Sequence, residues 1–310
     1  MDDNGAGISN RRCRVTNKSG CLFEAIELNA TLEGDRIMRI DAHQHFWKLS
    51  RGDYSWLTPD KTALYRDYLP ANLKPLLDET SIDGTIIVQA ADTTEETRYL
   101  LSLAESHSWI LGVVGWVDME SPQSIGLLEE LSLHPKFLGI RPMIQNIADD
   151  KWMLKPSLAP VFEQLQTLDL RFDALILPRH VKYLHELLKR YPKLKCVINH
   201  GAKPDIHGED YDGWANDIAH LAGDTNCFCK LSGLATKAAL INGGDALYPC
   251  MNHLLYIFGA NRLMFGSDWP VVNNTCDYKA WHDQVLSFSK QFSTEDQLAI
   301  FGNTATKFYL

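Results

Sequence analysis

Short apolar segments recur along this chain from residue 38 onward, and they alternate with longer segments whose apolar positions repeat every three or four residues. The short segments are typical of buried strands, and the longer ones are typical of amphipathic helices. The pattern predicts eight strands, at residues 39–46, 84–90, 111–118, 137–142, 170–177, 195–200, 227–234 and 262–268. It predicts helices between them, among others at 94–106, 158–168, 179–190 and 246–258.

Alternating strands and helices indicate a parallel sheet, because parallel neighbours need a long crossover connection. Eight such units close into a barrel, so we predict an α/β fold with a single (β/α)8 TIM-type domain over residues 38–310. An open, doubly wound sheet is the alternative. No glycine-rich phosphate loop follows the first predicted strand, which weighs against that alternative and against a nucleotide cofactor.

Residues 1–37 differ from the rest of the chain, since they are polar and contain only one short apolar patch, at 21–26. They lack the continuous apolar region of a signal peptide. We expect this segment to be an N-terminal extension outside the barrel core, whose deletion leaves activity intact.

Composition narrows the functional classes. The 310 residues are 45% hydrophobic with a formal net charge of −9 and no sustained basic block, which argues against nucleic acid or an anionic membrane as a partner. No apolar run approaches the roughly 18 residues of a membrane span. The seven cysteines are scattered without a CxxC pair, a pattern typical of reduced thiols. We therefore expect a cytoplasmic protein that acts on a small molecule.

Two histidines end the first predicted strand. His43 and His45 would project from the same face, because side chains alternate along a strand, and they could share one metal ion or substrate. A chance pair on the surface is the plain alternative for a chain with 11 histidines. Two distant segments favour a metal or substrate site over a chance pair, because Asp268 and His200 also follow apolar, strand-like runs.

In a barrel of this type, the carboxyl ends of the strands form the active site. The polar residues at such ends are His43, His45, Gln89, Asp118, Arg141, His200, Ser232 and Asp268. Ser232 lacks the GxSxG elbow of serine hydrolases, so we do not expect it to be a nucleophile.

Five ordered motifs carry a resemblance to a known family. They are HQHFW (43–47), GIRPM (139–143), NHGAKP (199–204), KLSGL (230–234) and GSDWPV (266–271). Together they resemble the amidohydrolase superfamily, and within it the sugar-lactone hydrolases of the L-fuconolactonase and L-rhamnonolactonase type. The resemblance implies a (β/α)8 barrel and a lactonase. It extends from about Met38 to Leu310.

The resemblance also limits the metal content. Binuclear amidohydrolases carry a lysine or carboxylate after strand four and a histidine after strand five, whereas this chain has Arg141-Pro142 and Leu177-Pro178 there. An arginine cannot ligate a cation. We expect one divalent ion, zinc or manganese, held by His43, His45 and Asp268, with His200 as the alternative third ligand, or no metal at all, as in a pyrone-dicarboxylate lactonase relative. His180, just after Pro178, is expected at the surface or behind the site.

Chemistry assigns a role to each remaining residue. Lactone hydrolysis needs a base, for which Asp268 is the candidate, and a group that stabilises the oxyanion, for which His200 is the candidate donor. Gln89, Arg141, Trp47 and Trp269 are predicted to bind substrate, and Lys203 is a weak candidate for attracting an anionic product. Because Arg141 is the main cation predicted at the strand ends, a neutral aldonolactone such as L-fucono-, L-rhamnono- or L-galactonolactone ranks above a dicarboxylate.

Two rival functions stay open. A decarboxylase of the same superfamily would use similar histidines and would release carbon dioxide. A barrel that only binds would lack water-activating chemistry, against which Asp268 and the histidine pair argue. The sequence leaves a homo-oligomeric state open.

Overall fold

The computed structural model describes residues 37–206, 208, 210–235 and 245–310. Eight parallel strands lie in chain order around a nearly closed barrel, which confirms the predicted fold. Each observed strand lies within or next to a predicted one and is shorter, because only its central residues pair with neighbours on both sides. The strands are β1 (Ile40–Gln44), β2 (Gly84–Val88), β3 (Ile110–Gly115), β4 (Phe137–Ile140), β5 (Arg171–Ala174), β6 (Cys196–Ile198), β7 (Phe228–Leu231) and β8 (Leu263–Phe265).

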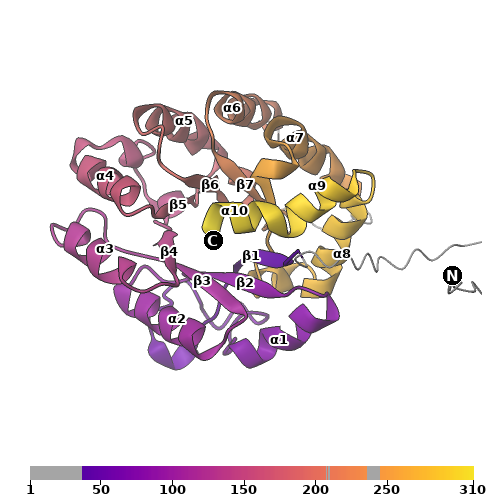
Figure 1. The fold of residues 1–310 in the computed structure, drawn as a ribbon, viewed down its shortest axis with the longest axis horizontal. Helices are drawn as coiled ribbons and strands as arrows, with labels where there is room; N and C mark the ends of the chain where they lie inside the picture. The colour runs from indigo at the N-terminus through magenta and orange to yellow at the C-terminus, as the bar shows by residue number, and fades with distance from the viewer. Residues whose placement is uncertain (1–36, 207, 209, 236–244) are drawn as a thin grey trace, which may run out of the picture. The chain divides into compact units, whose positions relative to one another are not determined.

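Helices surround the strands, as Figure 1 shows. The predicted helix at 94–106 matches α2, which begins there because the Thr93 side chain accepts a hydrogen bond from the Glu96 amide at 3.1 Å. The helices are α1 (Pro70–Glu79), α2 (Thr94–Ser106), α3 (Ser124–Ser132), α4 (Ala159–Thr167), α5 (Val181–Arg190), α6 (Tyr211–Asp224), α7 (Tyr248–Phe258), α8 (Tyr278–Ser289), α9 (Thr294–Leu298) and α10 (Thr304–Tyr309).

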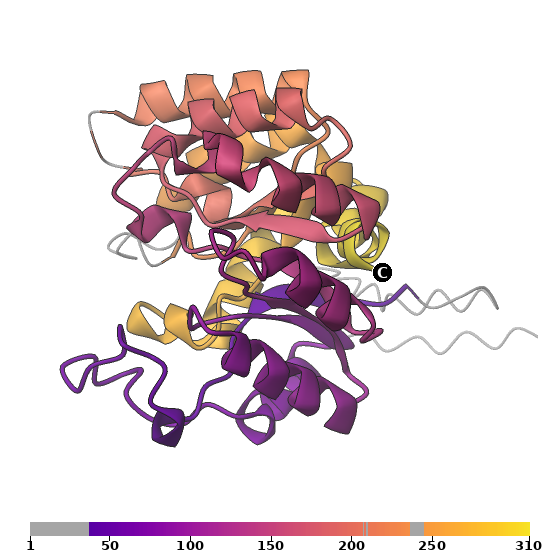
Figure 2. The ribbon, with the colours of Figure 1, turned by 90° about the vertical axis from the view of Figure 1, so that its left-hand side faces the viewer.

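Helix α10 covers the amino-terminal end of the barrel. Its Phe308 and Tyr309 belong to an apolar cluster with strand residues that include Ile40, Ala42 and Met264, all buried. In Figure 2 the loop that follows β1 extends on the side of the barrel away from α10. The two ends of the barrel therefore differ, with an apolar plug at one end and the long loops at the other.

The barrel closes between the segments that follow β1 and β8. The amide of His45 donates to the carbonyl of Trp269, and the amide of Asp268 donates to the carbonyl of His43, both at 2.7 Å. These two backbone bonds continue the parallel ladder past the strand ends. They fix the two histidines of the first strand beside the carboxylate of the last one.

Strand β1 contains an irregularity just before the histidines. Asp41 pairs with Thr85 while Gln44 pairs with Ile87, so β1 has one residue more than β2 over this stretch. The Asp41 side chain lies here and accepts from the amides of His43 at 3.1 Å and Ser267 at 2.8 Å. Such a bulge changes the face to which the following side chains point. It lets Ala42 pack in the apolar cluster while His43 points to the opposite end.

The N-terminal extension predicted for residues 1–37 lies, except for its last residue, outside the described residues, so its role stays a prediction. Among the residues that the structure describes, no helix is long and apolar enough to cross a membrane. The described cysteines, at 196, 227, 229, 250 and 276, are free thiols.

Candidate active site

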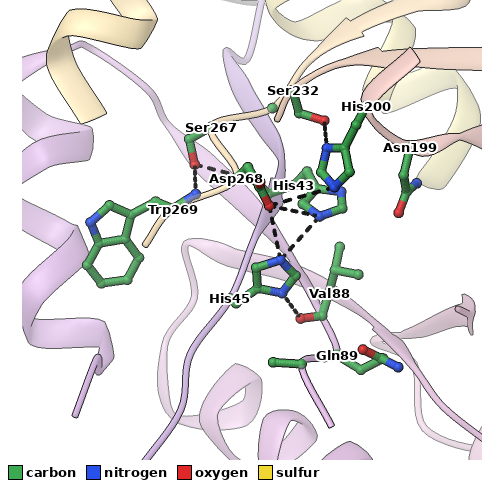
Figure 3. Close-up of polar contacts among 12 residues, drawn as sticks. His43, His45, Val88, Gln89, Asn199, His200, Ser232, Ser267, Asp268 and Trp269 are labelled. Carbon is green, nitrogen blue, oxygen red and sulfur yellow. Dashed lines mark hydrogen bonds and ion pairs between the residues drawn. The ribbon is translucent and has the colours of Figure 1, made fainter. Parts of the chain in front are cut away.

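Three histidines converge on one carboxylate at the carboxyl end of the barrel (Figure 3). The Nε2 atoms of His45, His43 and His200 lie 3.2, 3.6 and 3.8 Å from Oδ1 of Asp268. All four side chains are buried, with at most 4% of any of these residues exposed. The ends of β1, β6 and β8 supply them, so strands far apart in sequence meet here as the barrel geometry predicts.

Two glycines make room for this cluster. A β carbon on Gly266 would lie 2.7 Å from the β carbon of His43, and one on Gly233 would lie 2.4 Å from Nδ1 of His200. Either contact would displace a histidine. The glycines of the KLSGL and GSDWPV motifs are thus explained by the space that the histidines need.

The backbone is left-handed at two of the four residues. His200 has φ of 58° and Asp268 has φ of 56°, and neither is a glycine. Such a conformation costs about 1–3 kcal/mol per residue and persists only where the surrounding structure enforces it. The cost indicates that the position of these two side chains matters more than local stability.

Hydrogen bonds fix the proton on one of the histidines. Nδ1 of His45 lies 2.7 Å from the carbonyl oxygen of Val88, which can only accept, so Nδ1 carries the proton and Nε2 presents a lone pair toward Asp268. Nδ1 of His200 lies 2.8 Å from Oγ of Ser232. Because a serine hydroxyl can donate, His200 can carry its own proton on Nε2, the nitrogen that faces the cavity.

The electrostatics favour an ionised carboxylate among neutral imidazoles. Burial lowers the pKa of His43 well below its ordinary value, and nearby Lys230 lowers it further. Burial likewise lowers the pKa of His45, and that of His200 to about 3. Burial by itself raises the pKa of Asp268, but its interactions with His200 and His45 outweigh burial and lower that pKa to about 2. Asp268 is therefore ionised at neutral pH.

The cluster fits a divalent ion in its ligand types and spacing, and His43 is the one exception in its hydrogen bonding. One ligand atom from each of His43, His45 and Asp268 lies within 4.8 Å of the others. Ligands about 2.1 Å from a tetrahedral zinc stand roughly 3.4 Å apart, close to the 3.2–3.6 Å observed. His45 also donates its other nitrogen to a carbonyl, as metal ligands do. His43 departs from that rule, since its Nδ1 lies 3.4 Å from the ammonium of Lys230.

A cavity of about 290 Å³ opens beside the cluster. Pockets that hold drug-sized ligands have volumes of about 300–1,000 Å³, so this one, at the lower end, suits a small molecule such as a single sugar ring. Its lining combines apolar side chains with three cations and one carboxylate. The lining residues are His45, Trp56, Lys61, Ala90, Arg141, Met143, Gln145, Asn146, Leu175, His200, Lys203, Asp268 and Val271.

Five residues predicted at the site line this cavity: His45, Arg141, His200, Lys203 and Asp268. His43 lies behind them and is fully buried. Gln89, predicted to bind substrate, is not in the lining. Its amide nitrogen donates to the backbone carbonyl of Arg141 at 3.0 Å, and its Oε1 accepts from the Arg141 guanidinium at 2.9 Å. Gln89 therefore holds Arg141 rather than facing the cavity.

The two tryptophans predicted to bind substrate lie in the core. Trp47 and Trp269 are 0% and 2% exposed, and both pack edge-on against Tyr68. Figure 3 shows the indole of Trp269 pointing away from Asp268. The aromatic residue in the cavity wall is instead Trp56, from the loop after β1, which packs edge-on against Trp47.

Three further residues from the sequence analysis lie outside the cavity lining. His180 is not a surface residue: its side chain is buried, and its Nδ1 accepts from the amide of Leu177 at 3.1 Å. Asp118 follows β3 but is exposed and lies outside the cavity. Ser232 contacts His200 but is fully buried and does not line the cavity, which agrees with its exclusion as a nucleophile.

Sequence reasoning missed a buried ion pair behind His43. Lys230, in β7, and Asp173, in β5, are both fully buried, with Nζ 2.6 Å from Oδ2. The signal was available, because a lysine in the middle of the apolar run CFCKL must find a partner when the strand is buried. The partner could not be identified, since it lies on another strand.

The chain was also compared with known proteins. Residues 40–310 match the model of the amidohydrolase family. An L-fucono-1,5-lactonase of Burkholderia ambifaria is 41% identical over 87% of this chain and 95% of its own length. An L-fucono-1,5-lactonase of Burkholderia multivorans is 34% identical over 88% of this chain and 96% of its own length.

Solved structures agree with the sequence comparisons. An amidohydrolase of Burkholderia multivorans, crystallised with HEPES, superposes with a TM-score of 0.83 at 32% identity, over 88% of this chain and 99% of that one. A second crystal form of the Burkholderia multivorans amidohydrolase, with bound zinc, superposes with a TM-score of 0.82 at 32% identity, over 88% of this chain and 99% of that one.

Proposed function

Since this chain belongs to the amidohydrolase family, we propose that it hydrolyses a sugar lactone, an aldonolactone of the L-fucose type, to the aldonic acid. One observation carries the proposal most directly. An ionised, buried carboxylate, Asp268, stands in the wall of a cavity sized for one sugar ring, with His200 and Arg141 in the same wall. The relatives named above supply the substrate class.

Asp268 acts as the general base in this proposal. Its carboxylate takes a proton from a water molecule as the water oxygen bonds to the lactone carbonyl carbon. The same carboxyl group then gives the proton to the ring oxygen as the carbon–oxygen bond of the ring breaks. The products are the free hydroxyl and the acid, which ionises in water, so atoms and charge balance.

Two groups stabilise the negative charge that develops on the carbonyl oxygen. His200 donates from Nε2 while Ser232 holds its Nδ1, 2.8 Å away. Arg141 is 4% exposed and stays cationic, because burial lowers its pKa only to about 10. Its contacts with Gln89 hold the guanidinium in place before substrate arrives.

A divalent ion, zinc or manganese, would be held by His45 and Asp268 with His43 as the third ligand, and it would polarise the carbonyl and acidify the water. The zinc bound in the Burkholderia multivorans structure supports a divalent ion as a cofactor.

Trp56 and the cations complete the substrate site. The indole of Trp56 offers a flat apolar surface for the C–H face of a sugar ring. Lys203, a candidate from the sequence, and Lys61, which the sequence analysis did not single out, add two cations to Arg141. In a lactonase these charges attract the carboxylate of the product, and they are also the feature that would suit a dicarboxylate substrate.

A panel of lactones tests the proposal. Acid release from L-fucono-, L-rhamnono- and L-galactonolactone is compared with that from a pyrone dicarboxylate, each with and without chelator. We expect the highest kcat/KM for an aldonolactone. A higher value for the dicarboxylate would overturn the substrate assignment, and carbon dioxide released from a carboxylated aromatic ring, with no lactone turnover, would indicate a decarboxylase.

A further inference from the structure

The segment after β6 makes a complete left-handed turn at the cavity. Its residues 200–203 have φ between 54° and 62°, and of these only Gly201 is a glycine. The amide of Lys203 donates to the carbonyl of His200 at 2.8 Å, which closes the turn. Residues other than glycine adopt this conformation singly rather than in a run, because each pays a steric cost. A run of this kind at the edge of a cavity indicates that its side chains have a function there.

The fold holds this turn from behind. The indole nitrogen of Trp214, in α6, donates to the carbonyl of Gly201 at 2.8 Å. Ala202 is fully buried in the apolar core, and a β carbon on Gly201 would lie 3.0 Å from the side chain of Leu254 in α7. Strained backbone persists only where the surrounding structure enforces it. Helices α6 and α7 therefore fix the turn before any ligand binds.

The turn places two side chains next to each other in the cavity wall. Where a turn is closed by a hydrogen bond between residues i and i+3, the side chains of those residues eclipse. His200 and Lys203 stand in this relation, and both line the cavity. The ammonium of Lys203 also donates to Oε1 of Gln145, another lining residue, at 2.6 Å. The turn and Gln145 thus hold this ammonium at the cavity wall.

Lys203 differs in its surroundings from Lys61, the other lysine of the cavity wall. Lys61 donates to the backbone carbonyl of Trp56, and its ammonium lies 5.2 Å from the centre of the Trp56 ring, so it is directed at its own loop. Lys203 shares its turn with His200, whose Nε2 lies 3.8 Å from Oδ1 of Asp268 (Figure 3). Of the two lysines, Lys203 is the one fixed to the Asp268 cluster.

Hydrolysis of a neutral lactone creates a charge that the substrate did not have. The product carboxylate forms at the carbon that water attacks, beside the carboxylate of Asp268, and two negative charges in one cavity repel each other. A cation fixed at the same place offsets that repulsion and forms a charge-assisted hydrogen bond with the product. The site would then hold an anion more tightly than a neutral molecule of the same shape.

We propose that Lys203 is the carboxylate-binding residue of this site, and that it makes the cavity selective for hydroxy-acid anions over neutral polyols, so that the aldonate product inhibits the enzyme. The left-handed turn serves to fix this ammonium beside the reacting group. The inhibition rests on the proposed lactonase function, whereas the selectivity for anions does not.

Isothermal titration calorimetry with two matched ligands tests the selectivity. L-Fuconate carries a carboxylate where L-fucitol carries a hydroxymethyl group, and neither contains a lactone bond. We expect the wild-type protein to bind L-fuconate about 10- to 100-fold more tightly, the range of a hydrogen bond to a charged group. Equal affinities would overturn the proposal. The titrations are repeated after dialysis against a chelator, and a preference that disappears there would assign the carboxylate to a metal ion, against the proposal.

Four variants, each checked for folding by circular dichroism, test whether Lys203 causes the preference. Lys203→Met should reduce it to about threefold or less, and Lys203→Arg should restore most of it, because a guanidinium also binds carboxylates. Gln145→Glu places a carboxylate beside the ammonium, so it should weaken the binding of L-fuconate and not that of L-fucitol. Lys61→Met is the matched control and should lose less of the preference than Lys203→Met. A preference that survives in Lys203→Met, or an equal loss in Lys61→Met, would contradict the proposal.

Kinetics separate this inference from the proposed function. L-Fuconate should inhibit lactone hydrolysis competitively, and Lys203→Met should raise its inhibition constant about tenfold or more, with a smaller change in the KM of the neutral lactone. An unchanged inhibition constant would overturn the inference and leave the lactonase function standing. A protein that hydrolyses no lactone and still prefers L-fuconate through Lys203 would refute the lactonase function and support the anion site.

Discussion

The two ends of the barrel are built from the same strands and hold opposite kinds of residue. In β1, Ile40 and Ala42 belong to the apolar cluster under α10, whereas His43 and, just after the strand, His45 face Asp268. Both ends exclude water, since all four of these residues are at most 3% exposed. Burial alone therefore does not distinguish the end under α10, which we call the structural end, from the end that holds Asp268, which we call the chemical end.

What differs is the free energy of burial. Apolar side chains stabilise the fold by about 25 cal/mol for each Å² removed from water. A buried imidazole or carboxylate instead costs free energy unless it is hydrogen-bonded or paired. The amino-terminal end of the barrel thus stabilises the fold. The carboxyl-terminal end lowers that stability, because it holds buried neutral histidines and left-handed backbone around a base. Four substitutions separate the two ends.

The largest effect is expected from Asp268→Asn at the chemical end. The substitution keeps the shape but removes the base, so kcat should fall by about 10²- to 10⁴-fold while the protein stays folded. Steady-state kinetics measure this. Asp118→Asn, a strand-end carboxylate outside the cavity, is the matched control and should keep its activity. Near-normal turnover in the Asp268 variant would mean that another group is the base.

Phe308→Ala tests the structural end. Phe308 is 3% exposed and its ring centroid lies 4.7 Å from that of Phe228, so truncation leaves a cavity. We expect the free energy of unfolding in urea to fall by about 3 kcal/mol. The kcat of the folded fraction should change little. A loss of kcat as large as that of the Asp268 variant would show that the two ends are not separable.

Trp56→Ala probes the cavity wall. We expect KM to rise about tenfold with a small change in kcat, because an aromatic surface binds substrate and transition state alike. Trp47→Phe is the contrasting variant. It should lower the melting temperature and leave KM unchanged, since Trp47 is in the core. The reverse outcome would restore Trp47 as the substrate-binding tryptophan.

Glu96→Gln gives the smallest and most specific effect. Glu96 is buried beside β2 and accepts from the amides of Ala90 and Ala91, and burial raises its pKa to about 8. The folded protein then holds a proton that the unfolded chain, with a pKa near 4.5, releases. Stability from this group is complete below pH 4.5 and is lost as the pH rises through 8.

The melting temperature of the wild type should therefore decline by a few degrees across that pH range, and Glu96→Gln should flatten the decline. The exposed neighbour provides the control, since Glu95→Gln should keep the wild-type slope. An identical slope in the Glu96 variant would show that other groups cause the pH dependence. A flattened decline in the Glu96→Gln variant would also show that a buried carboxyl group near the chemical end can be purely structural.

Sequence periodicity predicted the fold well because each strand and helix carries its own pattern. The strand-end rule also found His45, Arg141, His200 and Asp268, which line the cavity. It was wrong for Asp118 as a cavity residue, because a polar residue after a strand can turn outward with the loop. The rule predicts at which end of the barrel a residue lies, but it does not predict the direction in which each side chain points.

The errors in the substrate site have one cause. Trp47 and Trp56 belong to the same loop, and only the tertiary packing decides which indole is covered. Gln89 and Lys230 were likewise beyond reach, because their partners, Arg141 and Asp173, come from other strands. Pairings between distant strands are the information that a single sequence does not display.

The hydrogen bonds that join the ends of β1 and β8 have a consequence for folding. His45 and Asp268 are separated by 223 residues, so their contact is among the most non-local in the chain. Forming it requires the loss of much chain entropy, and topologies dominated by such contacts fold slowly. A ligand that recognises His45 and Asp268 together would bind only after β1 and β8 have come together to close the barrel. The rate at which ligand binding appears during refolding would then measure the rate of barrel closure.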